Sequence, residues 1–252
     1  MRLLLTNDDG IDADGTRELA SFLSSRGHEV TVVAPFDNQS GSSAALGITQ
    51  RTAVRWEDRG TPVAFGGAHC IAIDATPAAA VMLGCAGSVC PRPQAVVAGI
   101  NHGLNVGRAI LHSGTVGAVL TAASLGISAA AISMDDDAPP MWSTAVRIAE
   151  ATLEALGRAQ SRTVVNVNVP ALPMDKLRGY RRGVIAAYGR DRPVLDPAGG
   201  GALAVGRRPS PVPLDPDSDA GLVSNGFVSV SGLVGIQLSG VDLCADIAGL
   251  LA

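Results

Sequence analysis

Aromatic residues are scarce in this chain of 252 residues, where Phe, Trp and Tyr together make up 3%. Hydrophobic residues still account for 47% of the sequence and charged residues for 17%, which excludes an intrinsically disordered chain. The core must therefore be built mainly from Ala, Val, Leu and Ile, which usually fill helix-covered parallel sheets. The length allows one large domain, or one domain with an appendage.

Clusters of basic residues are also missing. No run of Lys and Arg exceeds pairs such as Arg181-Arg182 and Arg207-Arg208, and the formal net charge is −4. This balance argues against a nucleic-acid duplex or an anionic membrane as the main partner. A small anion could still bind locally, through a metal ion and backbone amides.

The sequence also lacks paired cysteines, a signal peptide and a long apolar run. No CxxC pair and no His pair at zinc spacing occurs, so we expect buried free thiols in a reducing compartment. The N-terminus has no basic region followed by an apolar stretch, and the segment 110–134 is too polar for a membrane span. We therefore expect a cytoplasmic protein. The cysteines are Cys70, Cys85, Cys90 and Cys244.

What the sequence does contain is a β-α-β pattern at its start. Residues 3–6 are typical of a short buried strand, 15–27 show helical periodicity, and 28–35 predict a second strand. Asp12 or Asp14 can cap the start of the helix. A β-α-β unit of this length implies parallel strands with a right-handed crossover.

The same alternation continues more loosely along the chain, which predicts an α/β fold. We expect a Rossmann-like, doubly wound and mainly parallel sheet. The further strands are expected at 94–101, 129–133 and 163–170, and the further helices at 113–125 and 142–158.

Composition changes near residue 196. The segment 196–219 is rich in Gly and Pro and has no sustained period, which predicts an arm or an extended loop. Residues 227–231 then predict a strand and 241–251 a short helix. We therefore expect a catalytic core over 1–180. Residues 181–252 would form an arm or oligomerisation segment whose final strand and helix pack back on the core.

Polar side chains follow the predicted strands. Asn7, Asp8 and Asp9 follow the first strand, Ser40 lies in the loop after the second, and Asn101 ends the third. In open α/β sheets, ligands bind at the carboxyl ends of the strands. Adjacent carboxylates repel each other unless a cation lies between them, and the remaining side chains also offer oxygen. Such a set suits Mg²⁺ or Mn²⁺, with Ca²⁺ as a further option.

The motif HSGTVG adds a candidate anion site. Ser113, Gly114 and Thr115 begin a predicted helix and offer backbone N–H groups and two hydroxyls to a phosphate. A divalent cation beside such a site is the arrangement used in phosphate chemistry. Taken alone, each motif could also be an ordinary cap or turn. His102 and His112 flank the site, and a hydrogen-bonding or packing role for each stays open.

These stretches resemble the SurE survival-protein family of metal-dependent nucleoside monophosphate phosphatases. The matching stretches are LLTNDDGIDADG, VVAPFDNQSGSS, VVAGINHGLNVG, HSGTVGA and LGISAAAIS, followed by NVNVP and SDAGLVSNGFVSVSGL. The resemblance implies a 5′/3′-nucleotidase that acts on small nucleotides and uses one divalent cation per subunit. It implies that Asp8, Asp9, Ser40 and Asn101 hold this cation. It further implies a homodimer or homotetramer in which the C-terminal arm is exchanged.

A mechanism follows as a hypothesis. Asp8 and Asp9 hold the metal, which polarises the phosphoryl group and activates water, while Asn7 positions ligands in the same loop. Ser113 to Thr115 stabilise the phosphoryl oxygens as charge shifts in the transition state.

Three other function classes are alternatives to the nucleotidase. A response-regulator receiver needs an aspartate and a lysine after later strands, and this chain has neither there; it is also about twice a receiver's length. A non-catalytic metal- or nucleotide-binding relative stays open, because Ala79, Ala80 and His112 depart from the family's Asp, Cys and Tyr. A purely structural dimerisation role, with the acids as helix caps, is the third alternative.

Overall fold

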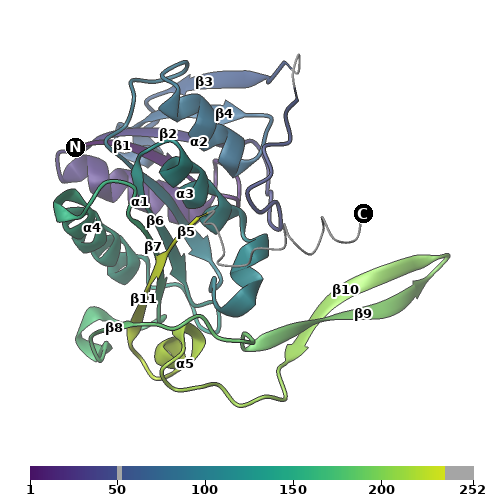
Figure 1. Cartoon of the computed structure of the whole chain (residues 1–252). Helices are drawn as coiled ribbons and strands as arrows, with labels where there is room; N and C mark the ends of the chain where they lie inside the picture. Colours follow the sequence, from purple (N-terminus) through teal and green to yellow (C-terminus); the bar gives the residue numbers. More distant parts are fainter. Residues whose placement is uncertain (50–52, 236–252) are drawn as a thin grey trace, which may run out of the picture.

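The computed structural model describes residues 1–49 and 53–235, most of which surround one nine-stranded sheet (Figure 1). The strand order of its central part reverses between β1 and β5, which is the order of doubly wound nucleotide-binding sheets. The six parallel strands run in the order β4 (His69–Ile73), β2 (Glu29–Pro35), β1 (Arg2–Thr6), β5 (Ala95–His102), β6 (Ser128–Met134) and β7 (Val164–Val169).

Both edges of the sheet depart from the parallel arrangement. β3 (Trp56–Gly60) pairs antiparallel with β4, and β11 (Val228–Leu233) pairs antiparallel with β7. β8 (Tyr180–Arg182) completes the second edge, parallel to β11. The predicted doubly wound, mainly parallel sheet is therefore confirmed. The sequence pattern did not reveal β3, β4 and β8.

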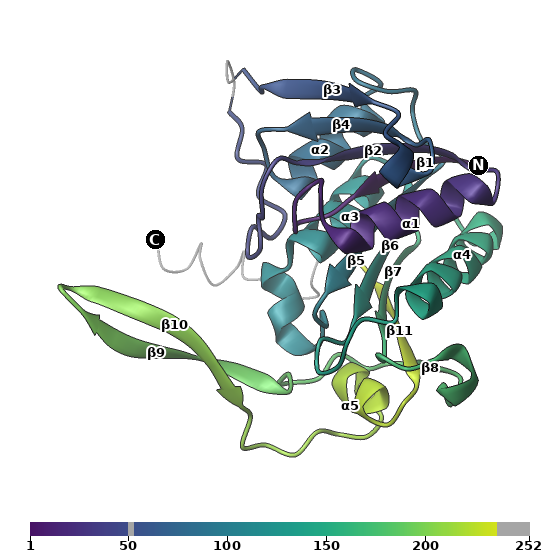
Figure 2. The same cartoon turned by 180° about the vertical axis from the view of Figure 1, so that it is seen from behind.

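Helices cover both faces of the sheet (Figures 1 and 2). α1 (Asp14–Ser25) and α4 (Trp142–Arg158) pack together on one face, and α2 (Pro77–Cys85) and α3 (Gly114–Ser124) on the other. The short helix α5 (Asp219–Ser224) lies beside β11. Single turns of 3₁₀ helix occur at Val63–Phe65 and Met174–Lys176, and a longer one at Gly107–His112.

Strand β1 shows how the core is divided between the two faces. Leu3 and Leu5 belong to the apolar cluster beneath α1 and α4, whereas Leu4 belongs to the cluster beneath α2 and α3. Successive side chains of a strand point to opposite faces, so a continuous apolar run fills both clusters. Gly84 of α2 lets that helix approach closely, since a Cβ there would lie 2.8 Å from Leu4 Cδ2.

The start of α1 differs from the expectation. Ala13 is the N-cap residue, and no side chain caps the helix, so the prediction that Asp12 or Asp14 caps it is wrong. The carboxylate of Asp12 instead accepts hydrogen bonds from Arg59 at 2.9 and 3.0 Å. Asp14 lies inside the first turn and pairs with Arg17. Each acid therefore pairs with an arginine and does not cap the helix.

Residues 191–209 form a separate hairpin that projects from the body of the molecule (Figures 1 and 2). Its strands are β9 (Asp191–Gly199) and β10 (Ala202–Pro209), and the glycines at the turn all have positive φ. The expected arm or loop is thus a regular hairpin that begins before residue 196. Prolines in this segment argue against central strands, because proline cannot donate a backbone hydrogen bond. Each strand of a two-stranded ribbon is an edge strand, which tolerates proline. The strand expected at 227–231 is β11, and the helix expected at 241–251 lies outside the described residues.

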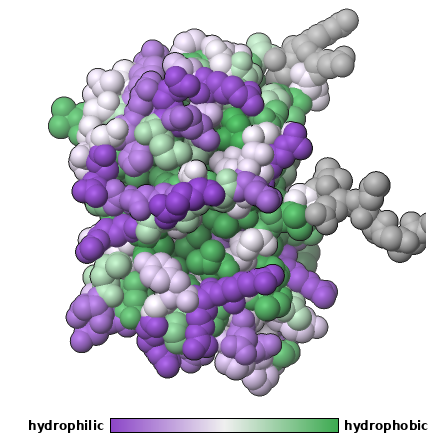
Figure 3. All heavy atoms as spheres, turned by 60° about the vertical axis from the view of Figure 1, so that its left-hand side comes forward, coloured by the Kyte–Doolittle hydropathy of each residue, from purple (hydrophilic) through white to green (hydrophobic). Residues whose placement is uncertain are grey.

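The surface and the thiols complete the description. Hydrophilic and hydrophobic side chains are mixed over the face in Figure 3, with a hydrophobic area near its centre.

Cys70, Cys85 and Cys90 are free and buried as expected, while Cys244 lies outside the described residues. Burial raises the pKa of the Cys70 thiol to about 12 and that of Cys85 to about 11, which makes them poor nucleophiles. None of the described helices has both the length and the apolar character needed to cross a membrane.

Candidate functional site

The predicted site residues meet where the strand order reverses. A cavity of about 430 Å³ opens at the carboxyl ends of β1 and β5. This is the position at which doubly wound sheets bind ligands, and the volume suits a small organic ligand. Five predicted residues line the cavity: Asp8, Asp9, Ser40, Asn101 and Ser113. Asn7, Gly114 and Thr115 adjoin these residues in the chain but do not line it.

Asp8 is held firmly in place. Its side chain is buried, and its Oδ1 accepts a hydrogen bond of 2.5 Å from the hydroxyl of Thr115, which is itself fully buried. Its backbone carbonyl accepts the N–H of Gln39 at 2.6 Å. The first carboxylate is therefore tied both to the start of α3 and to the loop after β2.

Gly114 brings α3 directly against this carboxylate. A Cβ at Gly114 would lie 2.7 Å from Asp8 Cβ and 2.7 Å from Ser42 Oγ, so no larger residue fits without displacement. Ser113 is the N-cap residue of α3, and its Oγ accepts the N–H of Val116 at 3.1 Å. Its own hydroxyl hydrogen is not used in that bond and can be donated to a ligand.

Asp9 carries a charge that the fold does not favour. Burial raises the pKa of Asp9 from 3.8 to about 6, with a further contribution from the charge of Asp8. A hydrogen bond from the backbone N–H of His102 acts in the opposite direction without cancelling the increase. The charge of the His102 ring also lowers the pKa of Asp9 without cancelling the increase, so a further positive charge would stabilise the two neighbouring carboxylates.

Ser40 and Asn101 complete a set of oxygen donors. The loop that carries Ser40 is fixed by its N–H, which donates to Asn38 Oδ1 at 2.8 Å. The Nδ2 of Asn101 donates to the carbonyl of Gly103 at 2.6 Å, which leaves Asn101 Oδ1 available. Two carboxylates, one hydroxyl and one amide oxygen are ligands that suit Mg²⁺ or Mn²⁺. The residues present therefore fit a divalent cation.

Asn7 lies behind the site. It is 1% exposed, and its Nδ2 donates to the carbonyl of Gly10 at 2.7 Å, which closes the loop that presents the two carboxylates. Within residues 1–49 and 53–235, its Oδ1 has no hydrogen-bond partner. Its contacts are those of a residue that shapes the loop.

The two histidines that flank the site both line the cavity. The ring of His102 also packs edge-on against Trp142, with 5.8 Å between the ring centroids. His102 therefore both packs against Trp142 and lines the cavity. His112 lies at the end of the 3₁₀ helix that precedes Ser113.

Sequence reasoning did not identify the role of the buried asparagines of β7. The carbonyl of Asn105 accepts hydrogen bonds from Asn166 Nδ2 at 2.8 Å and Asn168 Nδ2 at 2.9 Å. The N–H of Asn105 donates to Asn168 Oδ1 at 2.9 Å. These bonds fix the loop that follows β5. The alternation in NVNVP was the available signal, because polar side chains on one face of a buried strand need partners.

A second acidic group, Asp135 to Asp137, brings three carboxylates within 4.8 Å of one another after β6. Arg190 compensates this charge: it donates to both oxygens of Asp135, at 2.7 and 3.2 Å, and to Asp137 at 2.5 Å. Asp136 and Arg190 both line the cavity. We interpret this group and Arg190 as an ion-pair network that holds the loop after β6 against the base of the hairpin.

Asp219 is a further residue that the sequence did not single out as functional. Its buried carboxylate accepts the N–H groups of Gly107, Ala186 and Ala220 at 2.8 to 3.0 Å. Burial raises the pKa of Asp219, although these bonds oppose the effect. The residue joins the loop after β5 to the segment that leads into the hairpin, and so supports two walls of the cavity.

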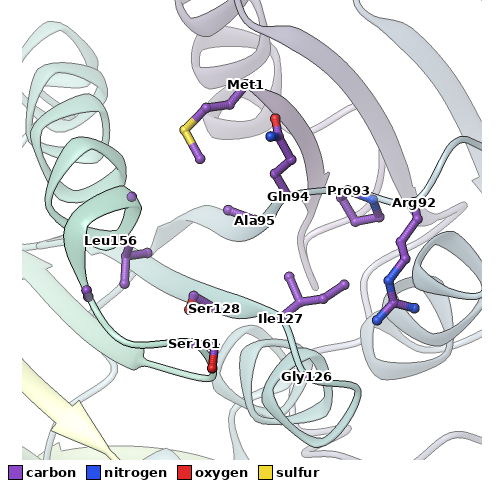
Figure 4. A pocket seen from close by; sticks show the side chains of 12 residues that line it. Met1, Arg92, Pro93, Gln94, Ala95, Gly126, Ile127, Ser128, Leu156 and Ser161 are labelled. Atoms are coloured by element: carbon purple, nitrogen blue, oxygen red, sulfur yellow. The ribbon is translucent and has the colours of Figure 1, made fainter.

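A second cavity of about 460 Å³ lies at the opposite ends of the strands, at the amino ends of β5 and β6 (Figure 4). Its main polar groups already have protein partners. Arg92 donates to the carbonyls of Cys85 and Leu125, and Ser128 Oγ donates to the carbonyl of Gln160. No Asp or Glu is among the described residues that line this cavity, in contrast to the first.

The contact between α3 and Asp8 can be tested with glycine substitutions. We expect Gly114→Ala to lower the free energy of unfolding by about 1–3 kcal/mol and to weaken Mn²⁺ binding, because the new methyl group displaces Asp8. Gly157→Ala in α4 is the matched control, since nothing lies within 4 Å of its Cβ. It should raise stability by about 0.5–1 kcal/mol. Urea unfolding and calorimetry measure both effects; unchanged values for Gly114→Ala would contradict the close contact.

The charge of Asp9 can be tested without turnover. In EDTA at pH 8, we expect Asp9→Asn to raise the melting temperature by about 2–4 °C, because one of two like charges is removed while the acceptor for the His102 N–H is kept. The folded-state pKa of about 6 lies above the unfolded value of 3.8, so the destabilisation of the wild type develops between these pH values and is complete above about pH 6. The difference should therefore shrink at pH 5.

Added Mn²⁺ should stabilise the wild type and not Asp9→Asn. Thermal unfolding at both pH values, with and without the metal, gives the result. Equal melting temperatures of the two proteins at pH 8 in EDTA would show that the charges are not in conflict.

Comparison with known proteins identifies the family of this chain. The family model described as "Survival protein SurE" matches residues 3–192. A 5'-nucleotidase SurE from Legionella pneumophila (strain Lens) is 36% identical over 242 residues, which cover 92% of this chain and 90% of the relative. A 5'/3'-nucleotidase SurE from Photorhabdus laumondii subsp. laumondii is 35% identical over 238 residues, which cover 92% and 89%. The crystal structure of the SurE protein from Aquifex aeolicus matches with a TM-score of 0.79 and 27% identity, over 100% of both chains. The chain described here therefore belongs to the SurE family.

Proposed function

We propose that this protein is a divalent-metal-dependent phosphatase that hydrolyses nucleoside 5′- and 3′-monophosphates to nucleoside and phosphate. The observation that carries the proposal is the convergence of Asp8, Asp9, Ser40 and Asn101 on one cavity beside the start of α3. The names of the relatives, 5'-nucleotidase and 5'/3'-nucleotidase, supply the substrate class.

Those four residues would hold one Mg²⁺ or Mn²⁺ per subunit. When bound, the cation supplies polarisation of the phosphoryl group and activation of water. Thr115 keeps Asp8 in position through its hydroxyl, and the N–H of His102 does the same for Asp9. Both carboxylates are thereby oriented before any ligand enters.

The start of α3 would bind the substrate phosphate. The hydroxyl of Ser113, which lines the cavity, and the first N–H groups of the helix, at Gly114 and Thr115, which adjoin Ser113 without lining the cavity, would be the donors for the phosphoryl oxygens. The second hydroxyl expected here, that of Thr115, donates to Asp8 instead. Because these donors are fixed by the helix, they can stabilise charge that develops during phosphoryl transfer without moving.

The alternative of a non-catalytic binding relative is less favoured. Ala79 and Ala80 are both fully buried in α2 and do not line the cavity, so two of the departures from the family pattern affect packing. Only His112 among the three departures lies at the cavity. The metal-ligand set is unaffected by all three. A cytoplasmic location remains part of the proposal, supported by the free thiols of the three cysteines in the described residues.

Phosphate release tests the proposed function. With Mn²⁺ or Mg²⁺, the wild type should release phosphate from nucleoside 5′- and 3′-monophosphates, and EDTA should stop the release. Asp8→Asn should lower kcat/KM by more than about 100-fold, because the cation loses a charged ligand. Asp14→Asn, at an exposed acid of α1, should leave kcat/KM unchanged. A fully active Asp8→Asn enzyme would contradict the scheme, and absence of release from the folded wild type would favour the binding relative.

We also propose that the hairpin β9–β10 is the arm through which copies of the chain form a homodimer or homotetramer. The register pairs Leu195 with Val205 and Leu203 with Pro197, so these apolar side chains lie on one face of the ribbon. Leu195 and Leu203 are each 62% exposed, and Val205 is 75% exposed. An isolated two-stranded hairpin is marginally stable in water, so a partner surface would stabilise this face. This assignment keeps a core over 1–180 and an arm segment over 181–252, with β11 paired to β7 of the core.

A pair of neighbouring substitutions tests the arm. Leu203→Lys places a charge on the apolar face and should shift the chain toward monomer, because burying an unpaired charge is costly. Ala204→Lys places the same charge on the opposite face, across from Asp196, and should keep the wild-type mass. Light scattering after size exclusion measures the masses. A wild type that is already monomeric, or equal masses for the two variants, would argue against the arm.

A further inference from the structure

The base of the hairpin forms one wall of the cavity. Pro193, Val205 and Arg207 all line it. Arg207 pairs with Pro193 across the ribbon, and Val205 lies two residues from Arg207, so the three side chains share the apolar face. On this face, Val205 therefore lines the cavity that holds the two carboxylates, while Leu195 and Leu203, which do not line it, are the side chains left for a partner copy.

The lining of the cavity has two chemically different parts. Carboxylate, amide and hydroxyl groups come from the strand ends and the start of α3, as described above. Apolar side chains come from the loop after β5 and from the hairpin. Val106 of that loop lies against Gly189, since a Cβ at Gly189 would be 3.9 Å from Val106 Cγ2. Gly189 precedes Pro193 by four residues. Val106, Pro193 and Val205 thus line the part of the cavity next to the hairpin.

Arg207 has no counterion among the residues that the structure describes. In the described part of the chain, no carboxylate lies within 4.0 Å of its guanidinium, whereas the adjacent Arg208 pairs with Asp196 at 3.2 Å. Arg190, which also lines the cavity, is occupied by the acidic group after β6. Arg192 lines the cavity as well, but its register partner is Arg208, so it lies on the opposite face of the ribbon from Arg207. The guanidinium of Arg207 is therefore free to lie against a ligand.

The scarcity of aromatic residues limits which side chains of the cavity can stack on a nucleobase. No Phe, Tyr or Trp is among the described residues that line the cavity. Proteins hold nucleobases by stacking them on aromatic rings or on the plane of an arginine guanidinium. The rings of His102 and His112 line the same cavity, but on the apolar face of the hairpin the guanidinium of Arg207, next to aliphatic side chains, is the flat surface that can cover a base.

We propose that Pro193, Val205 and Arg207 form the nucleoside subsite of this cavity, with Arg207 stacked on the base and the two apolar residues against the sugar and the base edge. The inference rests on the proposed nucleotidase function and adds the part of the substrate that the hairpin recognises. It makes the hairpin a specificity element that favours nucleotides over smaller phosphate monoesters.

The test compares Arg207→Gln with Arg208→Gln, a neighbouring arginine that does not line the cavity. The substrates are adenosine 5′-monophosphate and ribose 5-phosphate, with Mn²⁺. Arg207→Gln should raise KM for the nucleotide about tenfold with little change in kcat, as expected for one lost cation–π contact. Its kcat/KM for ribose 5-phosphate should stay within about twofold of the wild type, and Arg208→Gln should match the wild type on both.

Each other outcome overturns the subsite. Equal losses on both esters would assign Arg207 to the phosphate, equal losses in both variants would reflect the shape of the ribbon, and no loss would remove Arg207 from the site. If the wild type cleaves neither ester, the proposed function fails separately. Calorimetric titration of adenosine 5′-monophosphate in EDTA then decides the subsite. Binding about tenfold weaker in Arg207→Gln supports it, and equal or absent binding overturns it.

Discussion

Two carboxylates held side by side at the end of a buried strand are the constraint on which the rest of the site depends. The fold raises the pKa of Asp9 to about 6 and yet fixes both acids with hydrogen bonds from Thr115 and from the His102 backbone. Gly114 lets a helix begin against them. Such an arrangement costs stability in the metal-free protein, and the cation that we propose at this position would offset that cost. The reversal of strand order between β1 and β5 supplies the open position where that ligand can be reached.

The features that the sequence predicts are those governed by local pattern. The run from Leu3 to Thr6 predicts a buried strand. In a parallel sheet, the acids that follow this strand lie at the carboxyl ends of the strands. Ser40 and Asn101 follow from the same rule applied to two later strands, and Ser113 from a helix start. These residues do line one cavity. Local pattern also predicts the face of α4 that is buried, because its apolar residues recur with helical period.

The features that escaped prediction depend on contacts between distant segments. Arg190 and Asp135 are 55 residues apart, and Asp219 and Gly107 are 112 apart, so no local pattern marks them as partners. The hairpin escaped because Pro193 and Pro197 are unfavourable in central strands and harmless in an isolated ribbon. The cap of α1 was mistaken because Asp12 has an ion-pair partner, Arg59, that only the folded chain brings near.

The most direct test of the account is the anomalous scattering of Mn²⁺ in a crystal of this protein. We predict one peak per chain, between the carboxylates of Asp8 and Asp9 and within coordination distance of Ser40 and Asn101, at the usual oxygen-ligand separation of about 2.0–2.6 Å. A peak at Asp135 to Asp137 would move the metal to the group that we assign to Arg190. The absence of a peak at Asp8 and Asp9 in Mn²⁺-saturated crystals would contradict the explanation of the paired carboxylates.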